Sequence, residues 1–97
     1  MNAADSPPAI SHDPDAGRFH TALDGHEAEL TYRLDGRLLV IDHTWVPQAI
    51  GGRGIAGCLV RAAFEHARAE GRRVVPACSY AAVWATRHPE FADTLAG

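Results

Sequence analysis

The sequence predicts an α/β fold with a small mixed sheet, in which an antiparallel meander is followed by a β-α-β crossover and C-terminal helices. Three observations predict it. Extended segments separated by Asp-Gly pairs fill the region before Pro47. A glycine-rich turn then leads into one amphipathic helical pattern. A short apolar segment follows that helix, and the length of 97 residues allows one domain.

The meander should consist of three strands, at residues 18–23, 26–34 and 37–46. Asp24-Gly25 and Asp35-Gly36 separate these strands, and Asp-Gly between apolar runs is a strong hairpin signal because both central positions favour positive φ. The third strand is apolar on both faces at residues 38–41. This pattern predicts a central strand that is covered on both sides.

The crossover should follow the meander directly. A helix is expected at residues 55–70, with Ile55 and Leu59 on its inward apolar stripe, and Gly71 ends it. The segment "RRVVPAC" at 72–78 is the next expected strand. Because a strand–helix–strand crossover joins parallel strands, this strand should lie parallel to the third one, and the connection should be right-handed.

The two ends of the chain have different character. A second helix should open with Ser79 as its N-cap and break at His88-Pro89, before a last short turn. At the other end, residues 1–17 are rich in Pro, Asp and Ser, and they are expected to be a disordered lead-in. The domain is therefore expected at residues 18–97.

Composition excludes several classes of function. The net charge of −3, from 9 basic and 12 acidic residues, argues against a nucleic-acid partner. No apolar run approaches the length of a membrane span and no secretion signal is present, so a cytoplasmic protein without a membrane partner is expected. Cys58 and Cys78 match no zinc spacing, which indicates a reduced, intracellular protein with no metal.

The turn "GGRGIAG" at Gly51–Gly57 is a candidate phosphate site, because a glycine-rich turn at a helix start presents backbone N–H groups to an anion. It also fits the dinucleotide pattern G-x-G-x-x-G. However, the acidic ribose ligand of that fold should end the next strand, where Cys78 and Ser79 stand. A P-loop is excluded because the chain has no lysine. A loop that only connects strand and helix stays open as the alternative.

The segment "VPQAIGGRGIAGCLV" at 46–60 resembles the pyrophosphate loop of the GNAT superfamily of N-acetyltransferases. The resemblance is closest to its very short single-domain members, on four motifs in one order. These are H-T-x-V-P at 43–47, G-x-G-I-A-x-x-L-V at 52–60, P-x-C-S-Y at 76–80 and H-P-E at 88–90. The resemblance implies acetyl-CoA as co-substrate, transfer of acetyl to an amine, and a mixed sheet in the order expected above.

The resemblance also implies which residues contact coenzyme A. The pantetheine arm should follow the third strand at Thr44, Trp45 and Val46. The pyrophosphate should lie on the turn, at Gly51, Gly52, Arg53, Gly54, Ile55 and Ala56, with Arg53 as a mobile counter-charge. The second helix should contribute Ser79 and Arg87, although Arg87 and His88 equally suit capping of the helix C-terminus.

Three residues are candidates for the chemistry, each with a structural alternative. Cys78, beside a helix N-terminus, is a candidate nucleophile or a small buried hydrophobe. Tyr80 is a candidate proton donor to the leaving thiolate, or an aromatic residue at the core edge. Trp84, one turn later, can occupy the same place but would only pack. His43 is a candidate general base, or a hydrogen-bonded core histidine.

The side of the domain where the acceptor amine would bind is expected to have no covering helices. Full-size GNAT enzymes place two covering helices between their first strands, whereas Asp24-Gly25 closes a tight hairpin here. The expected function is therefore an acetyl-CoA-dependent N-acetyltransferase that acts on an amine of a protein or peptide. A non-catalytic module that binds or senses coenzyme A or acyl-CoA is the alternative, and a plain interaction domain is the third.

Overall fold

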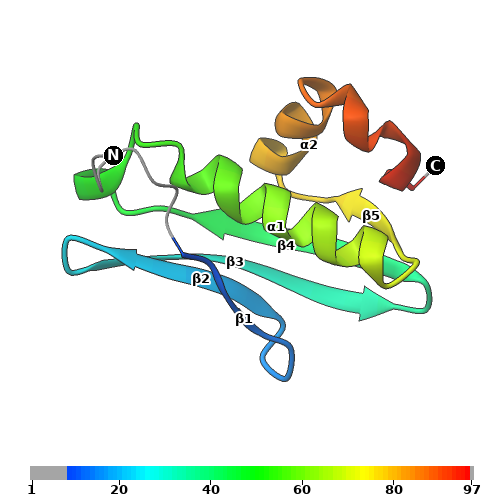
Figure 1. The fold of residues 1–97 in the computed structure, drawn as a ribbon, viewed down its shortest axis with the longest axis horizontal. Helices are drawn as coiled ribbons and strands as arrows, with labels where there is room; N and C mark the ends of the chain where they lie inside the picture. The colour runs from blue at the N-terminus through cyan, green and yellow to red at the C-terminus, as the bar shows by residue number, and fades with distance from the viewer. Residues whose placement is uncertain (1–8, 97) are drawn as a thin grey trace.

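The computed structural model describes residues 9–96. Five strands form one sheet in the order β1-β2-β3-β4-β5, with every neighbouring pair antiparallel except the parallel pair β4–β5. This confirms the predicted α/β class, the meander and the crossover. The elements, shown in Figure 1, are β1 (Ser11–Asp13), β2 (Arg18–Leu23), β3 (His26–Asp35), β4 (Leu38–Trp45), η2 (Gln48–Ile50), α1 (Ile55–Ala69), β5 (Arg73–Pro76), α2 (Ser79–Thr86) and η3 (Pro89–Thr94).

Strand β1 contradicts the expectation of disorder in the second half of the lead-in. His12 stacks on Phe19 of β2, with ring centroids 4.1 Å apart, and its Nε2 lies 2.5 Å from the hydroxyl of Tyr32 in β3. Gly17 permits the return of the chain, since its φ is +66° and a Cβ there would lie 2.5 Å from the Tyr32 carbonyl oxygen. Residues 1–8 of the expected lead-in lie outside the described residues.

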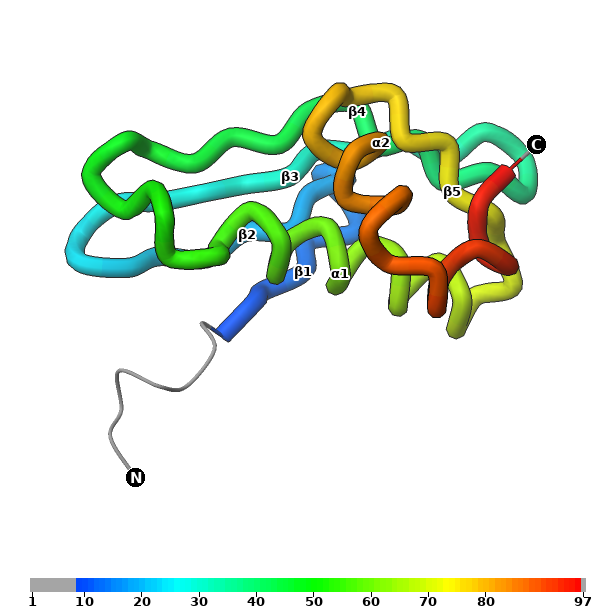
Figure 2. Tube along the Cα trace, turned by 90° about the horizontal axis from the view of Figure 1, so that it is seen from above, coloured from blue at the N-terminus to red at the C-terminus, as the bar shows by residue number. Residues whose placement is uncertain are grey.

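The helices share one hydrophobic core with one face of the sheet. Phe64 of α1 is fully buried and packs against Trp84 of α2 and Phe91 of η3, at centroid distances of 5.2 and 5.5 Å. The inner face of the sheet contributes Leu30, Tyr32, Leu39 and Ile41 to the same cluster. Figures 1 and 2 show α1 lying over the sheet, roughly along the strands, with α2 beside it.

The prediction for the central strand is only partly right. Leu39, Val40 and Ile41 are all buried, and β4 lies between β3 and β5, as expected. However, Val40 pairs in register with Arg33, on a face that no helix of residues 9–96 covers. That face carries ion pairs instead, between Arg33 and Asp42 at 3.4 Å and between Arg18 and Glu27 at 2.6 Å.

The sheet opens between β4 and β5 at one end. Pairing of these strands stops at Ile41 and Pro76, where the Ile41 carbonyl accepts the backbone N–H groups of Ala77 and Cys78 at 3.0 and 3.2 Å. Strand β4 continues to Trp45, paired with β3 alone. The opening therefore lies at the end of β4 that leads into the glycine turn.

Helix α2 is capped by Cys78 and not, as predicted, by Ser79. Cys78 is extended, with φ −86° and ψ 146°, and its Sγ accepts the N–H of Ala81 at 3.4 Å. The bond from Cys78 N–H to the Ile41 carbonyl holds Cys78 in the extended conformation, so helical geometry begins one residue later. No helix of residues 9–96 is long and apolar enough to cross a membrane.

The position of His12 predicts a dependence of stability on pH. Burial, followed by the nearby His66, lowers the pKa of His12, while Asp13 acts in the opposite direction. The unfolded chain then binds the proton more readily, so the stabilisation is complete above the unfolded pKa of about 6.5 and is lost as pH falls through the folded value. Urea unfolding between neutral and acidic pH should show this loss, and His12→Gln should flatten it.

The control for this experiment is His26→Gln, at the exposed first residue of β3. This variant should keep the slope of the parent protein. An unchanged slope in His12→Gln would show that His12 does not carry the effect.

The cap at Cys78 predicts different effects for two small substitutions. Cys78→Ala removes the acceptor for the Ala81 N–H and should lower the free energy of unfolding by about 1 kcal/mol. Cys78→Ser keeps a side-chain acceptor and should lose less. Chemical denaturation of both variants measures the difference, and equal stability of the two would show that the sulfur does not act as a cap.

Candidate functional site

The glycine turn has the backbone geometry of an anion site. Gly52 and Gly54 have φ of +78° and +75°, and Gly54 is the N-cap of α1. A Cβ built on either glycine would meet nothing within 4 Å, so the space beside the turn is open. The first N–H groups of a helix have no intrahelical partner and carry its partial positive charge. The turn therefore offers backbone donors to a negatively charged ligand.

A cavity of about 280 Å³ borders this turn. Most of the predicted cofactor-binding residues are brought together there, because Val46, Gly51, Gly52, Gly54, Ile55 and Ala56 all line it, together with Ile50 and Tyr80. The Ile55 side chain is 2% exposed and belongs to the core. Its backbone N–H is thus the group available to a ligand.

Arg53 is paired rather than free. Its guanidinium donates to the Asp24 carboxylate at 2.7 Å and so connects the glycine turn to the tip of the β2–β3 hairpin. Both side chains are about half exposed. An exposed ion pair contributes about 0–1 kcal/mol to stability. A phosphate in the cavity can therefore replace Asp24 as the partner of Arg53 with a loss of no more than that.

At the opening of the sheet, β4 presents Thr44 inward. Its hydroxyl lies 3.5 Å from the sulfur of Cys78, and both side chains are partly buried. The Cys78 sulfur thus contacts a hydroxyl and the backbone N–H of Ala81, an environment that suits both a packed thiol and a nucleophile. Trp45, the next residue of β4, is 51% exposed.

His43 is exposed, so its interpretation as a core histidine is wrong. Leu39 and Ile41 face the core, and simple alternation would place His43 beside them. The register instead pairs Thr31 with His43 and Tyr32 with Ile41, which leaves Asp42 as an extra residue in β4. This β-bulge turns Thr44 toward Cys78 and His43 toward solvent.

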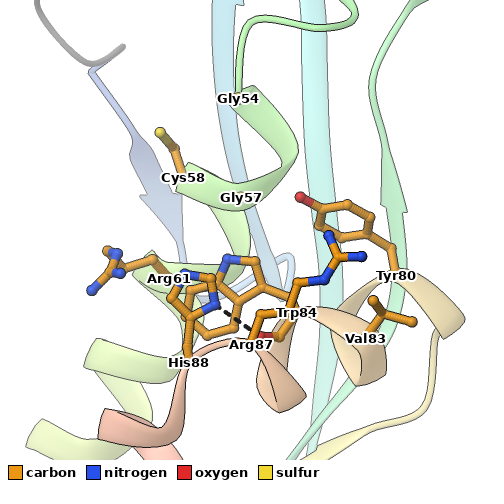
Figure 3. A pocket seen from close by; sticks show the side chains of 9 residues that line it. All are labelled: Gly54, Gly57, Cys58, Arg61, Tyr80, Val83, Trp84, Arg87 and His88. Atoms are coloured by element: carbon orange, nitrogen blue, oxygen red, sulfur yellow. Dashed lines mark hydrogen bonds between the residues drawn. The ribbon is translucent and has the colours of Figure 1, made fainter.

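A second cavity, of about 360 Å³, lies between α1 and α2 (Figure 3). It shares Gly54 and Tyr80 with the first cavity. Arg87 lines it from the end of α2, whereas Ser79 is exposed and lines neither cavity. His88 is the residue that caps the helix end, since its Nδ1 bonds the Trp84 carbonyl at 2.8 Å.

Tyr80 lines both cavities and is 43% exposed, which is compatible with a proton donor and with an aromatic residue at the core edge. Burial raises its pKa, Arg87 acts in the opposite direction, and Cys58 adds a smaller upward effect. The hydroxyl is therefore protonated at neutral pH and can donate.

Two lining residues were missed by sequence reasoning. Cys58, which the sequence did not indicate as a site residue, is partly exposed at the α1–α2 cavity. Trp84 was expected only to pack, yet its ring lines the same cavity. The helical spacing of Tyr80 and Trp84, four residues apart, was the signal that both side chains share one face of α2. Residues 9–96 contain no group of His, Cys, Asp and Glu side chains that could hold a metal ion.

Comparisons with known proteins agree with this geometry. The solution structure of a GCN5-like putative N-acetyltransferase from Staphylococcus aureus is similar to this chain, with a TM-score of 0.74 and 30% sequence identity. The similarity covers 95% of this chain and 91% of that protein. Residues 18–94 match the sequence profile of the GCN5-related N-acetyl-transferases. The glycine turn, the long helix that it opens and the split sheet beside it are therefore those of a family member. This chain belongs to the GCN5-related N-acetyltransferase family.

Proposed function

We propose that this protein binds acetyl-CoA and transfers the acetyl group to an amine of a protein or peptide. One observation carries the proposal. The open backbone of Gly52 and Gly54, at the N-terminus of α1, borders a cavity at the end where β4 and β5 separate. An extended ligand with a phosphate at one end and amide groups along its length fits such a site.

The chain's own groups divide the binding between them. Backbone N–H groups of the turn Gly51–Ala56 bind the pyrophosphate, and Arg53 and Arg87 add positive charge. The backbone of Thr44–Val46, which continues beyond the last pair with β5, binds the amide-bearing pantetheine arm. Ser79 lines neither cavity and has no part in this proposal.

The chemistry requires a proton donor and an acceptor for the amine proton. Acetyl-CoA supplies an acetyl thioester when bound. Tyr80, whose phenol is protonated at neutral pH, donates its hydroxyl proton to the leaving sulfur. His43, exposed at the bulge of β4, is the proposed base for the amine. Transfer is direct, and Cys78 caps α2 without forming a bond to the acetyl group.

The acceptor side supports a protein or peptide substrate. Asp24 and Gly25 have φ of 52° and 77°, and they join β2 to β3 by a tight turn with no covering helix between them. A small molecule would find no enclosure there. We place the reaction in the cytoplasm, with coenzyme A and the acceptor as partners and without nucleic acid or membrane.

The alternatives give different outcomes in one assay. A non-catalytic coenzyme A module binds acetyl-CoA but releases no thiol when an acceptor peptide is added. A plain interaction domain does not bind acetyl-CoA at all. Calorimetric titration with acetyl-CoA followed by a thiol-release assay therefore separates all three.

Substitution of Gly54 tests the binding site. Asn tolerates positive φ, so Gly54→Asn should keep the turn while its side chain occupies the open space. We expect acetyl-CoA affinity to fall by at least roughly tenfold in calorimetry. Gly36→Asn is the matched control, because Gly36 also has positive φ and open space but lies in the β3–β4 turn. Equal affinities of the two variants would contradict the assignment of the turn.

The mechanism is tested by comparing Tyr80 with Cys78. Tyr80→Phe should lower kcat by roughly a hundredfold or more, since the proton donor is lost. Cys78→Ser keeps the helix cap and should retain much of the activity. Intact-mass spectra after incubation with acetyl-CoA alone should show no acetylated Cys78. An acetylated protein, together with an inactive Cys78→Ser variant, would establish the covalent route instead.

A further inference from the structure

The indole of Trp84 is buried but presents one unused donor to the α1–α2 cavity. The residue is 6% exposed. Its ring is stacked on His88 at 3.8 Å between centroids, and Phe64 packs against it at 5.2 Å. The backbone carbonyl of Trp84 accepts hydrogen bonds from the residues that follow it. The indole N–H, in contrast, has no acceptor within residues 9–96. Figure 3 shows this nitrogen directed toward Gly57.

The hydroxyl of Tyr80 points to the same place. A Cβ built on Gly57 would lie 3.4 Å from the Tyr80 hydroxyl oxygen and 3.5 Å from the Trp84 Nε1. Two donors without partners in residues 9–96 therefore converge on the space that the missing side chain leaves. Gly57 is the third residue of α1, and glycine within a helix costs up to about 1 kcal/mol relative to alanine. The open space over Gly57 exists at the expense of helix stability.

The charges around this space favour an anionic group. Arg87 lines the same cavity as Tyr80, and no carboxylate within residues 9–96 forms an ion pair with it. Arg61 is partly neutralised by Glu90, at 3.3 Å. Because neighbouring side chains pack on the indole ring, Trp84 offers a ligand its N–H edge rather than a stacking surface.

We propose that the Trp84 indole N–H and the Tyr80 hydroxyl together receive the sulfur that leaves the thioester, with Trp84 as a second catalytic donor. The amine nitrogen bonds to the carbonyl carbon as the carbon–sulfur bond breaks, and the electron pair of that bond moves to sulfur. Trp84 stabilises the developing thiolate by a hydrogen bond, and Tyr80 transfers its proton to it. His43 accepts the proton that the amine loses, and an equivalent proton returns to the Tyr80 oxygen through solvent. This inference rests on the proposed function.

The direct test follows the indole N–H resonances by NMR during titration with coenzyme A. Trp45→Phe leaves the Trp84 resonance alone in the spectrum and so assigns it. Coenzyme A should shift this resonance, whereas desulfo-coenzyme A, which lacks only the sulfur, should leave it close to its free position. An equal shift with desulfo-coenzyme A or with 3′,5′-ADP would show that the indole N–H responds to the rest of coenzyme A or to its phosphates and not to the sulfur. That result would overturn the inference.

Two variants extend the test to catalysis. Gly57→Ala places a methyl group between the two donors and favours the helix, so the melting temperature should be maintained or rise. Its kcat should fall by roughly a hundredfold. Trp84→Phe keeps an aromatic ring in the core but lacks the N–H, and it should lower kcat by roughly tenfold. A folded Gly57→Ala protein with the parent kcat would overturn the inference. Failure of coenzyme A to bind the parent protein would instead refute the proposed function.

Discussion

The carbonyl of Ile41 is the point on which the geometry of the site depends. It accepts the backbone N–H groups of both Ala77 and Cys78, and this ends the pairing of β5 with β4. The chain is then directed out of the sheet, and Cys78 is held extended as the cap of α2. Because β4 continues without β5, the sheet opens beside the glycine turn. One acceptor atom thus determines both the opening of the sheet and the start of the second helix.

The bulge in β4 complements this arrangement. An extra residue at Asp42 reverses the facing of every later side chain in the strand, because side chains alternate between the faces. Thr44 is thereby brought to the Cys78 sulfur, and His43 and Trp45 are left exposed. The two sides of the opening consequently differ in chemistry. The helix side carries the glycine turn and both cavities, whereas the other side carries paired charges and an exposed imidazole.

The walls of the α1–α2 cavity also belong to the core. Trp84 packs on Phe64 and Phe91 while its N–H edge faces the cavity, so the same ring contributes to stability and to the site. In a chain of this length the core is small, and few side chains are available for one purpose alone. The hairpin tip is similarly connected to the site, because Asp24 pairs with Arg53 of the glycine turn.

The sequence by itself determined the features that depend on local backbone preferences. The Asp-Gly hairpins, the helix that opens at Ile55 and the order of β4, α1 and β5 follow from positive-φ glycines and from the periodicity of apolar residues. Only the tertiary structure decided the role of His12, which pairs a short strand to the sheet through Tyr32, 20 residues away. The same is true of the cap at Cys78, the exposure of His43 and the direction of the Trp84 indole. Each of these depends on strand register or on contacts between residues distant in the chain, and no local pattern encodes such contacts.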